Sequence, residues 1–243
     1  LILTSKININ VFNNFDQTPD RPDSRLPHVR TDIVKYLQQS KDIHFENFQL
    51  DYFFTPSKDV YSKFSVGIFE KMYGGLGLEI LHKPFEKNYY FGLETFYVTK
   101  RDFNQMFDFL DYKTLTSHLM FNYFFEPLDI NLNLSYGRYL AKDEGYTFDL
   151  SRVSNLGIRM GFFFTRTNVS AELFGEGSFD KGFYFQIPID LFIRDYSSST
   201  ADFRLTPLTR DGGQKLKFEK SLQGLIHNSN LYEINRQWDG YLD

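Results

Sequence analysis

Apolar and polar residues alternate strictly along many short segments of this 243-residue chain. Between residues 128 and 136 every second residue is apolar, and the residues between them are aspartate, asparagine or serine. Side chains alternate between the two faces of a β-strand, so such a segment presents one apolar and one polar face. The same pattern recurs in segments 6–11, 47–54, 63–68, 75–80, 89–94, 118–125, 146–151, 156–164, 183–191 and 202–206. The alternation therefore predicts an all-β fold of about eleven strands.

A membrane barrel and a soluble sandwich both have alternating strands, and three features favour the barrel. The predicted strands are mostly longer than the ~5–6 residues typical of soluble sheets. Their apolar face carries almost no charge, whereas the other face carries Gly, Asn, Ser, Glu and Arg, as a water-filled lumen requires. Phenylalanine and tyrosine, 28 and 16 residues, crowd the strand ends as interfacial girdles do. We predict an antiparallel transmembrane β-barrel of about 10–12 strands in a bacterial outer membrane, with a soluble sandwich as the alternative.

The composition excludes other classes of protein. A membrane-spanning helix needs ~18 or more consecutive apolar residues, but the mean hydropathy is −0.39 and the apolar runs are only a few residues long. A net charge of −4 argues against nucleic acid as a partner. The five histidines are scattered without metal-ligand spacing, so we expect no metal and no cofactor.

The connections predict how the barrel is oriented and where its helices lie. Bacterial barrels keep short turns on the periplasmic side and long loops outside. The short connections are 56–58, 84–87, 126–127 and 153–155, and the long ones are 13–43, 101–113, 141–145 and 166–181. Short helices are predicted at 31–39 and, amphipathic, at 215–227. We expect one barrel over residues 1–243, with strands to about 210 and a helical terminal segment over 211–243. The chain begins without methionine or a leader, which indicates a processed product or a fragment.

Polar side chains on the predicted inner face and in the loops are candidates for lining the lumen or contacting a glycan, since carboxylates beside aromatic rings suit sugar hydroxyls and ring faces. These candidates are Arg138, Arg159, Glu172, Glu176, Asp180, Lys181, Arg204, Arg210 and Asp211. The alternative is a solvated loop, or inner-face charges that only neutralise each other. In that case Arg159 and Arg204 are expected to pair with Glu79, Glu94, Asp149 or Asp190.

The signals for an enzyme are weak. Ser117 and His118 are adjacent in a predicted strand and therefore point to opposite faces, so they cannot act together. An outer-membrane hydrolase that uses His118 with a serine from a neighbouring strand remains a minor alternative. The glycines of segment 74–77 precede no helix, which argues against a phosphate-binding loop.

Several of these segments resemble the YjbH/GfcD-type exopolysaccharide proteins. The matching segments are 26–32, 73–77, 137–143, 149–152, 168–172, 177–183 and 207–213. The resemblance implies the C-terminal barrel region of a longer outer-membrane protein encoded with genes for exopolysaccharide or group 4 capsule production, and it brings no catalytic residues. We therefore expect a non-enzymatic barrel that assists polysaccharide secretion or surface assembly. Its expected partners are outer-membrane lipid, polysaccharide and periplasmic proteins of the same operon or a second barrel. The alternative is a scaffold or binding barrel without a conducting pore, since about ten to twelve strands make a narrow barrel, plugged by segment 13–43 or 215–227.

Overall fold

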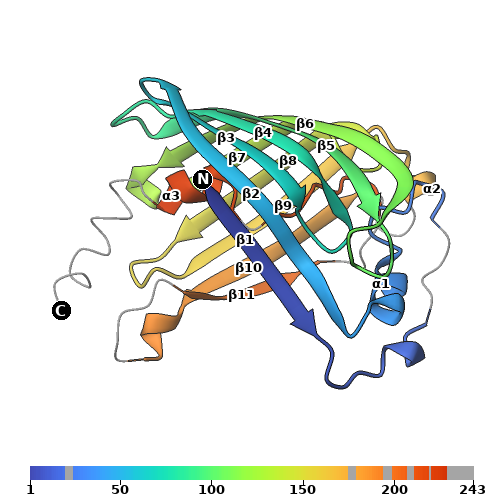
Figure 1. The fold of residues 1–243 in the computed structure, drawn as a ribbon. Helices are drawn as coiled ribbons and strands as arrows, with labels where there is room; N and C mark the ends of the chain where they lie inside the picture. Colours follow the sequence, from blue (N-terminus) through green and yellow to red (C-terminus); the bar gives the residue numbers. More distant parts are fainter. Residues whose placement is uncertain (20–23, 175–178, 194–198, 207–210, 219, 229–243) are drawn as a thin grey trace.

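The computed structural model describes residues 1–19, 24–174, 179–193, 199–206, 211–218 and 220–228, which form one antiparallel sheet with a few short helices (Figure 1). The strands are β1(Ile2–Ile9), β2(Ile43–Ser57), β3(Val60–Ile68), β4(Tyr73–His82), β5(Tyr89–Arg101), β6(Phe109–Phe125), β7(Ile130–Arg138), β8(Glu144–Val153), β9(Arg159–Thr167), β10(Asp180–Pro188) and β11(Thr200–Leu205). The all-β antiparallel fold and each of the predicted strands are confirmed. The one over 183–191 ends early, at Pro188, and η3(Ile189–Leu191) follows as a 3-10 turn.

The sheet has a simple meander topology with two free edges. Each strand pairs antiparallel with the next one along the chain, from β1 to β11. Within the described residues β1 pairs only with β2, and β11 pairs only with β10. The expectation of a closed barrel is therefore not met by this set of strands. The physical reason is their odd number: β1 and β11 run in the same direction, so the antiparallel bonds that join the other strands cannot join these two.

Polar side chains are buried on one face of the sheet, and apolar side chains are exposed on the other. The sheet curls so that one side is concave, and Figure 1 shows α3 within that curve. On β6 the side chain of His118, which faces the concave side, is 2% exposed, whereas that of its neighbour Leu119 is 64% exposed. Neighbouring strands repeat this arrangement, with Asn122 donating hydrogen bonds to Asn131 (2.8 Å) and Asn133 (2.7 Å) across the concave face. The concave side, here called the interior, is thus buried and carries many polar side chains beside the apolar core described below, whereas the convex side is apolar and exposed.

The connections differ in length at the two ends of the sheet. The long-loop end carries residues 10–19 and 24–42, which contain η1(Phe15–Gln17) and α1(Ile33–Gln39), and the helix α2(Ala171–Phe174) after β9. The short-turn end carries most of the tight turns, including the one with η2(Glu126–Leu128). The predicted helix over 31–39 is confirmed, although it begins two residues later, at Ile33. Within the described part of the chain, no helix is long and apolar enough to cross a membrane.

The C-terminal segment lies in the interior. It enters at Asp211 near the long-loop end and reaches α3(Leu222–Asn228), which contacts β3 and β4. The predicted helix over 215–227 is wrong in its first half, because residues 215–218 have no helical structure and α3 begins only at Leu222. Their groups contact the sheet and the loops instead: the Lys215 carbonyl accepts a bond of 2.6 Å from Arg30, and the Phe218 ring lies 4.9 Å from that of Phe96.

The apolar core lies between the long-loop end of the sheet, α1 and this C-terminal segment. It is therefore formed by side chains from distant parts of the chain. Its buried members are Val29, Tyr36, Phe69, Met72, Tyr73, Phe96, Val98, Leu140, Ala141 and Leu216.

Candidate functional site

Asp211 anchors the C-terminal segment to the loop before α1. Its Oδ1 atom accepts backbone N–H bonds from Val29 (2.9 Å), Arg30 (2.7 Å) and Thr31 (3.0 Å). Its Oδ2 atom accepts a fourth bond, 2.9 Å long, from the Thr31 hydroxyl. The side chain is 1% exposed. A carboxylate with this many donors is strongly bound, because hydrogen bonds to an ionised acceptor are about twice as strong as neutral ones.

Two further contacts hold the residues that follow Asp211. The Gly213 N–H donates to the Asp143 carboxylate (2.7 Å), and the Leu140 N–H donates to the Gln214 carbonyl (3.0 Å). Gly213 has a φ of +69°, a conformation that glycine adopts without strain. These contacts bring together three of the segments that carried the family resemblance. They are 26–32, 137–143 and the described part of 207–213, and they meet at the long-loop end.

Helix α1 is fixed to the sheet by buried polar contacts. Asp32 pairs with Lys100 of β5 and with Lys35, whose Nζ lies 2.8 Å from it. The Tyr36 hydroxyl donates to the Arg101 carbonyl (2.5 Å). Burial opposes the ionisation of Asp32, but the two lysine ammonium groups outweigh it and hold the pKa of this carboxyl below its usual value.

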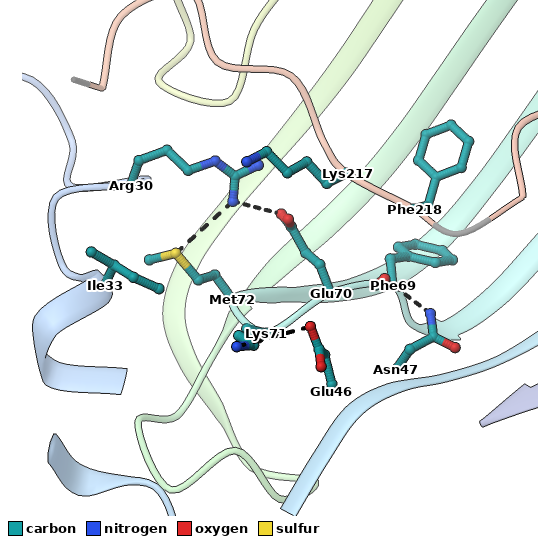
Figure 2. Close-up of a pocket in the computed structure, with 10 residues that line it drawn as sticks. All are labelled: Arg30, Ile33, Glu46, Asn47, Phe69, Glu70, Lys71, Met72, Lys217 and Phe218. Atoms are coloured by element: carbon teal, nitrogen blue, oxygen red, sulfur yellow. Dashed lines mark hydrogen bonds and ion pairs between the residues drawn. The ribbon is translucent and has the colours of Figure 1, made fainter. Parts of the chain in front are cut away.

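A cavity of about 490 Å³ opens beside this anchor, between α1, β2, the β3–β4 turn and the C-terminal segment (Figure 2). Its size lies within the usual range of small-ligand sites, ~300–1,000 Å³. The lining residues are Arg30, Ile33, Glu46, Asn47, Phe69, Glu70, Lys71, Met72, Lys217 and Phe218. None of these residues belongs to the candidate set predicted from the sequence.

The cavity combines charged groups with aromatic rings. Figure 2 shows the Arg30 and Lys217 side chains approaching each other from opposite sides, with their charged ends near the Glu70 carboxylate. The Arg30 guanidinium lies 2.8 Å from the Glu70 carboxylate. Burial raises the pKa of Glu70, although Arg30 and Lys217 act in the opposite direction. Burial and the neighbouring Arg30 lower the pKa of Lys217.

The wall of the cavity that β2 and the β3–β4 turn form is polar. Lys71 and Glu46 lie 3.9 Å apart, which is a loose ion pair. Asn47 donates a bond to the Phe69 carbonyl (3.0 Å), and the Phe69 and Phe218 rings close one side. The cavity thus offers both donors and acceptors next to aromatic carbon, a combination that suits a hydroxyl-rich ligand that carries negative charge.

The predicted site residues fall into three groups. Asp211 is the anchor, and the Asp180 carboxylate accepts a hydrogen bond of 3.3 Å from the side chain of Gln214, three residues after Asp211. Lys181 and Arg204 cover the rings of Phe179 (4.6 Å) and Phe163 (4.2 Å). The others are separate: Arg138 ends β7, Arg159 begins β9, and Glu172 is exposed in α2. Glu176 and Arg210 lie outside the described residues.

Of the four carboxylates named as alternative partners of Arg159 and Arg204, two pair with other cations. Glu79 pairs with Lys63 of β3, and Glu94 pairs with His118 (3.2 Å) and Lys215 (3.5 Å). Arg159 and Arg204 instead lie within electrostatic range of Asp149, as expected. Of Asp190, only the backbone is described. The inward positions of Lys63 and Glu79 were readable from the alternation, but their contact depends on strand register, in which they are direct partners.

His118 lies between a carboxylate and an aromatic ring among the described residues. Its Nδ1 faces Glu94, and its ring packs edge-on against Tyr139 at 4.7 Å. Ser117 faces the convex side and shares a hydrogen bond with Thr95 (3.0 Å), so the two residues are on opposite faces as expected. Among the described residues, no group of three or more potential His, Cys, Asp or Glu ligands could hold a metal ion.

We predict that Asp32→Asn lowers the free energy of unfolding by about 1.5–3 kcal/mol at pH 7, because a charge-assisted buried hydrogen bond is lost. The pKa of Asp32 is lowered in the folded state, so its contribution is present above the ordinary aspartate value and disappears as pH falls through the folded value. The difference between wild type and variant should therefore shrink toward pH 3. Urea unfolding at both pH values checks this, with Asp16→Asn at an exposed position as the control; an equal loss at both pH values would contradict it.

Fold and site together define a curled antiparallel β protein that is apolar outside, polar inside, and filled by its own C-terminal segment. The chain belongs to the YjbH family, described as exopolysaccharide biosynthesis protein YbjH, whose family model matches residues 1–228. It is 39% identical over 225 residues to the "Uncharacterized lipoprotein YjbH" of Escherichia coli strain K12, a match that covers 89% of this chain. The chain spans about a third of that relative, 32% of its length. No solved structure matches the chain. The resemblance seen in the sequence is thereby confirmed.

Proposed function

We propose that this chain forms the wall of a β-barrel in the bacterial outer membrane and assists the secretion or surface assembly of an exopolysaccharide, without catalysing a reaction. Family membership supports the link to exopolysaccharide. The relative described as a lipoprotein supports a membrane association. Outer-membrane lipid and the polysaccharide are the proposed partners, together with periplasmic proteins of the same operon or a second barrel.

The observation that carries the membrane proposal is the polarity of the sheet. Leu115, Leu119 and Tyr123, which alternate along the convex face of β6, are 46%, 64% and 40% exposed. Between them Thr116, His118 and Asn122 are at most 3% exposed in the interior. Such a large continuous apolar surface is rare on a soluble monomer, whereas a barrel in lipid requires it.

A charge on the convex face tests this location. We expect Leu119→Arg to reduce stability in lipid by about 2–4 kcal/mol, because a guanidinium at the middle of the bilayer is costly. Leu156→Arg is the matched control, since Leu156 is equally exposed, 64%, but lies in the β8–β9 turn. Unfolding of both variants of the full-length protein in lipid vesicles measures the difference. A soluble protein would tolerate both substitutions alike, and that result would refute the membrane proposal.

The cavity between α1 and the C-terminal segment is the proposed contact for the polysaccharide. Its Arg30, Lys71 and Lys217 suit acidic or phosphate-bearing sugars, and its Phe69 and Phe218 rings suit sugar faces. We predict that Lys217→Glu reduces exopolysaccharide secreted per cell at least several-fold, because it reverses a charge that faces the cavity and leaves Glu70 with a second carboxylate. Lys58→Glu, at an exposed position in the β2–β3 turn, should leave secretion unchanged. If both variants are present at equal protein levels and secrete equal amounts of exopolysaccharide, the cavity does not contact the polysaccharide.

A second candidate function is a binding or scaffold barrel with no conducting pore. The occupied interior favours it, because residues 211–228, where described, lie on the concave side and contact β3, β4 and β5. Planar-bilayer recordings separate the two candidates. An open conduit for polysaccharide should give stable openings, whereas a barrel filled by its own segment should stay silent.

A further inference from the structure

The two edge strands leave a row of backbone groups without partners in the described sheet. In an antiparallel pair, alternate residues direct their N–H and C=O groups to one neighbour, and the others face the opposite side. β1 uses only the groups that face β2, and β11 only those that face β10. Hydrocarbon offers no water to satisfy the remainder, so an open edge is not tolerated in lipid. This reasoning rests on the proposed membrane location.

Direct pairing of β1 with β11 does not solve the problem. Because every neighbouring pair is antiparallel, β1 and β11 both run from the short-turn end to the long-loop end. Their union would require a single parallel seam in an otherwise antiparallel barrel. Bacterial single-chain barrels have even strand numbers, which avoid such a seam. One additional strand, antiparallel to both β1 and β11, would give an even number of strands. It would also form hydrogen bonds with the outer backbone groups of both edge strands.

The burial of inward side chains independently marks a missing neighbour. On β2, Asn47 and Gln49 face the interior and are each 1% exposed. Their direct partners on β1 are Lys6, whose side chain is 53% exposed, and Thr4, which is half-buried. On the other edge, the inward-facing Arg204 of β11 is exposed, while its partner on β10 is half-buried. Inward-facing side chains are therefore more exposed on the two edge strands than on the strands next to them.

We propose that one further antiparallel β-strand fills the space between β11 and β1, and that it comes from a part of the full-length protein outside residues 1–243. The curated relative is about three times as long as this chain, which matches 32% of it, so the family's polypeptide has ample length for a further strand. The strand spans about the eight residues of β1 and runs from the long-loop end to the short-turn end. It alternates apolar residues outward, beside Leu3 and Phe203, with polar residues inward, beside Lys6 and Arg204.

Photo-crosslinking of the full-length protein in outer-membrane vesicles tests the proposal. A benzophenone amino acid is placed at Ser5 of β1 in one variant and at Phe203 of β11 in another, and the cross-linked peptides are identified by mass spectrometry. Both positions should capture the same peptide from outside residues 1–243 of the same polypeptide. The same probe at Phe121, in central strand β6, should capture only β5 or β7 and serves as the control.

Three outcomes would overturn the proposal. One is a direct cross-link between the β1 and β11 peptides, and another is capture of a second copy, seen by mixing isotopically labelled and unlabelled protein. The third is capture of a different polypeptide. If the probe variants do not fold, hydrogen exchange of the wild type decides: the outer amides of β1 should exchange as slowly as those of β5, and rapid exchange refutes the added strand. If the cross-links form but Leu119→Arg and Leu156→Arg change the stability in lipid equally, the added strand is supported and the membrane location is refuted.

Discussion

Asp211→Ala should release the C-terminal segment from the loop before α1 and lower the free energy of unfolding by about 3 kcal/mol or more, because several buried donors lose an ionised acceptor. The N–H groups of residues 29–31 and the Thr31 hydroxyl all bind this one carboxylate. Alanine offers no acceptor, and the 1% exposure of Asp211 leaves little room for water to replace it. Asp211→Asn should cost less, since its amide oxygen still accepts the three backbone bonds.

The release should be visible in two ways. Limited proteolysis of the full-length protein in lipid should cleave the segment after residue 211 much faster in the alanine variant than in wild type. Bilayer recordings should show more frequent or larger openings in the variant than in wild type, because the segment no longer occupies the interior. Asp42→Ala, at an exposed position, is the control. If Asp211→Ala protects the segment as well as wild type does, the carboxylate is not its anchor.

Lys63→Met should destabilise the protein by about 3–5 kcal/mol, because it leaves the Glu79 carboxylate as an uncompensated buried charge. The two side chains are 1% and 2% exposed and form an ion pair between β3 and β4. Lys63 also donates to the Lys220 carbonyl, and Glu79 accepts the Leu222 N–H at 2.9 Å. The pair therefore joins the start of α3 to the sheet, and its loss should loosen the helix as well.

A double substitution distinguishes charge from packing. Lys63→Met combined with Glu79→Gln removes both charges and keeps an acceptor for Leu222, so most of the lost stability should return. Lys113→Met, at an exposed position on β6, should have little effect. Additive losses in the double variant, measured by urea unfolding in lipid vesicles, would show that the ion pair is not coupled.

The strands were predictable from sequence because a period of two is a local property. The neighbours His118 and Leu119 show why: alternation alone placed them on opposite faces, and their exposures of 2% and 64% agree with that. The inverted polarity of the sheet followed from the residue types on each face. The free edges did not follow, since the pattern predicts strands but carries no information on whether the first pairs with the last.

The candidate site was only partly predictable, because its contacts join residues far apart in the chain. Asp211 was named as a candidate, but its binding to residues 29–31 depends on the path of the C-terminal segment. That path was misjudged: Leu216, Leu222, Leu225 and Ile226 predicted one amphipathic helix over 215–227, but the helix begins only at Leu222. Contacts of residues 215–218 with Arg30 and Phe96 outweigh local helix propensity there, which is a weak preference. The cavity residues Glu70 and Lys217 gave no sequence signal, since isolated charges in turns and terminal segments are usually solvated.

The central claim, that the convex face contacts lipid, is tested most directly by nitroxide scanning along β6 in lipid vesicles. Residues 1–243 contain no cysteine, so single cysteines can be introduced at successive positions within them. Labels at outward positions 115, 119 and 123 should collide often with oxygen, which dissolves in lipid, and rarely with a water-soluble nickel complex. A label at Leu156, in a turn, should show the opposite. If the outward labels on β6 meet nickel as often as the label at Leu156 does, the convex face is in water and the account is wrong.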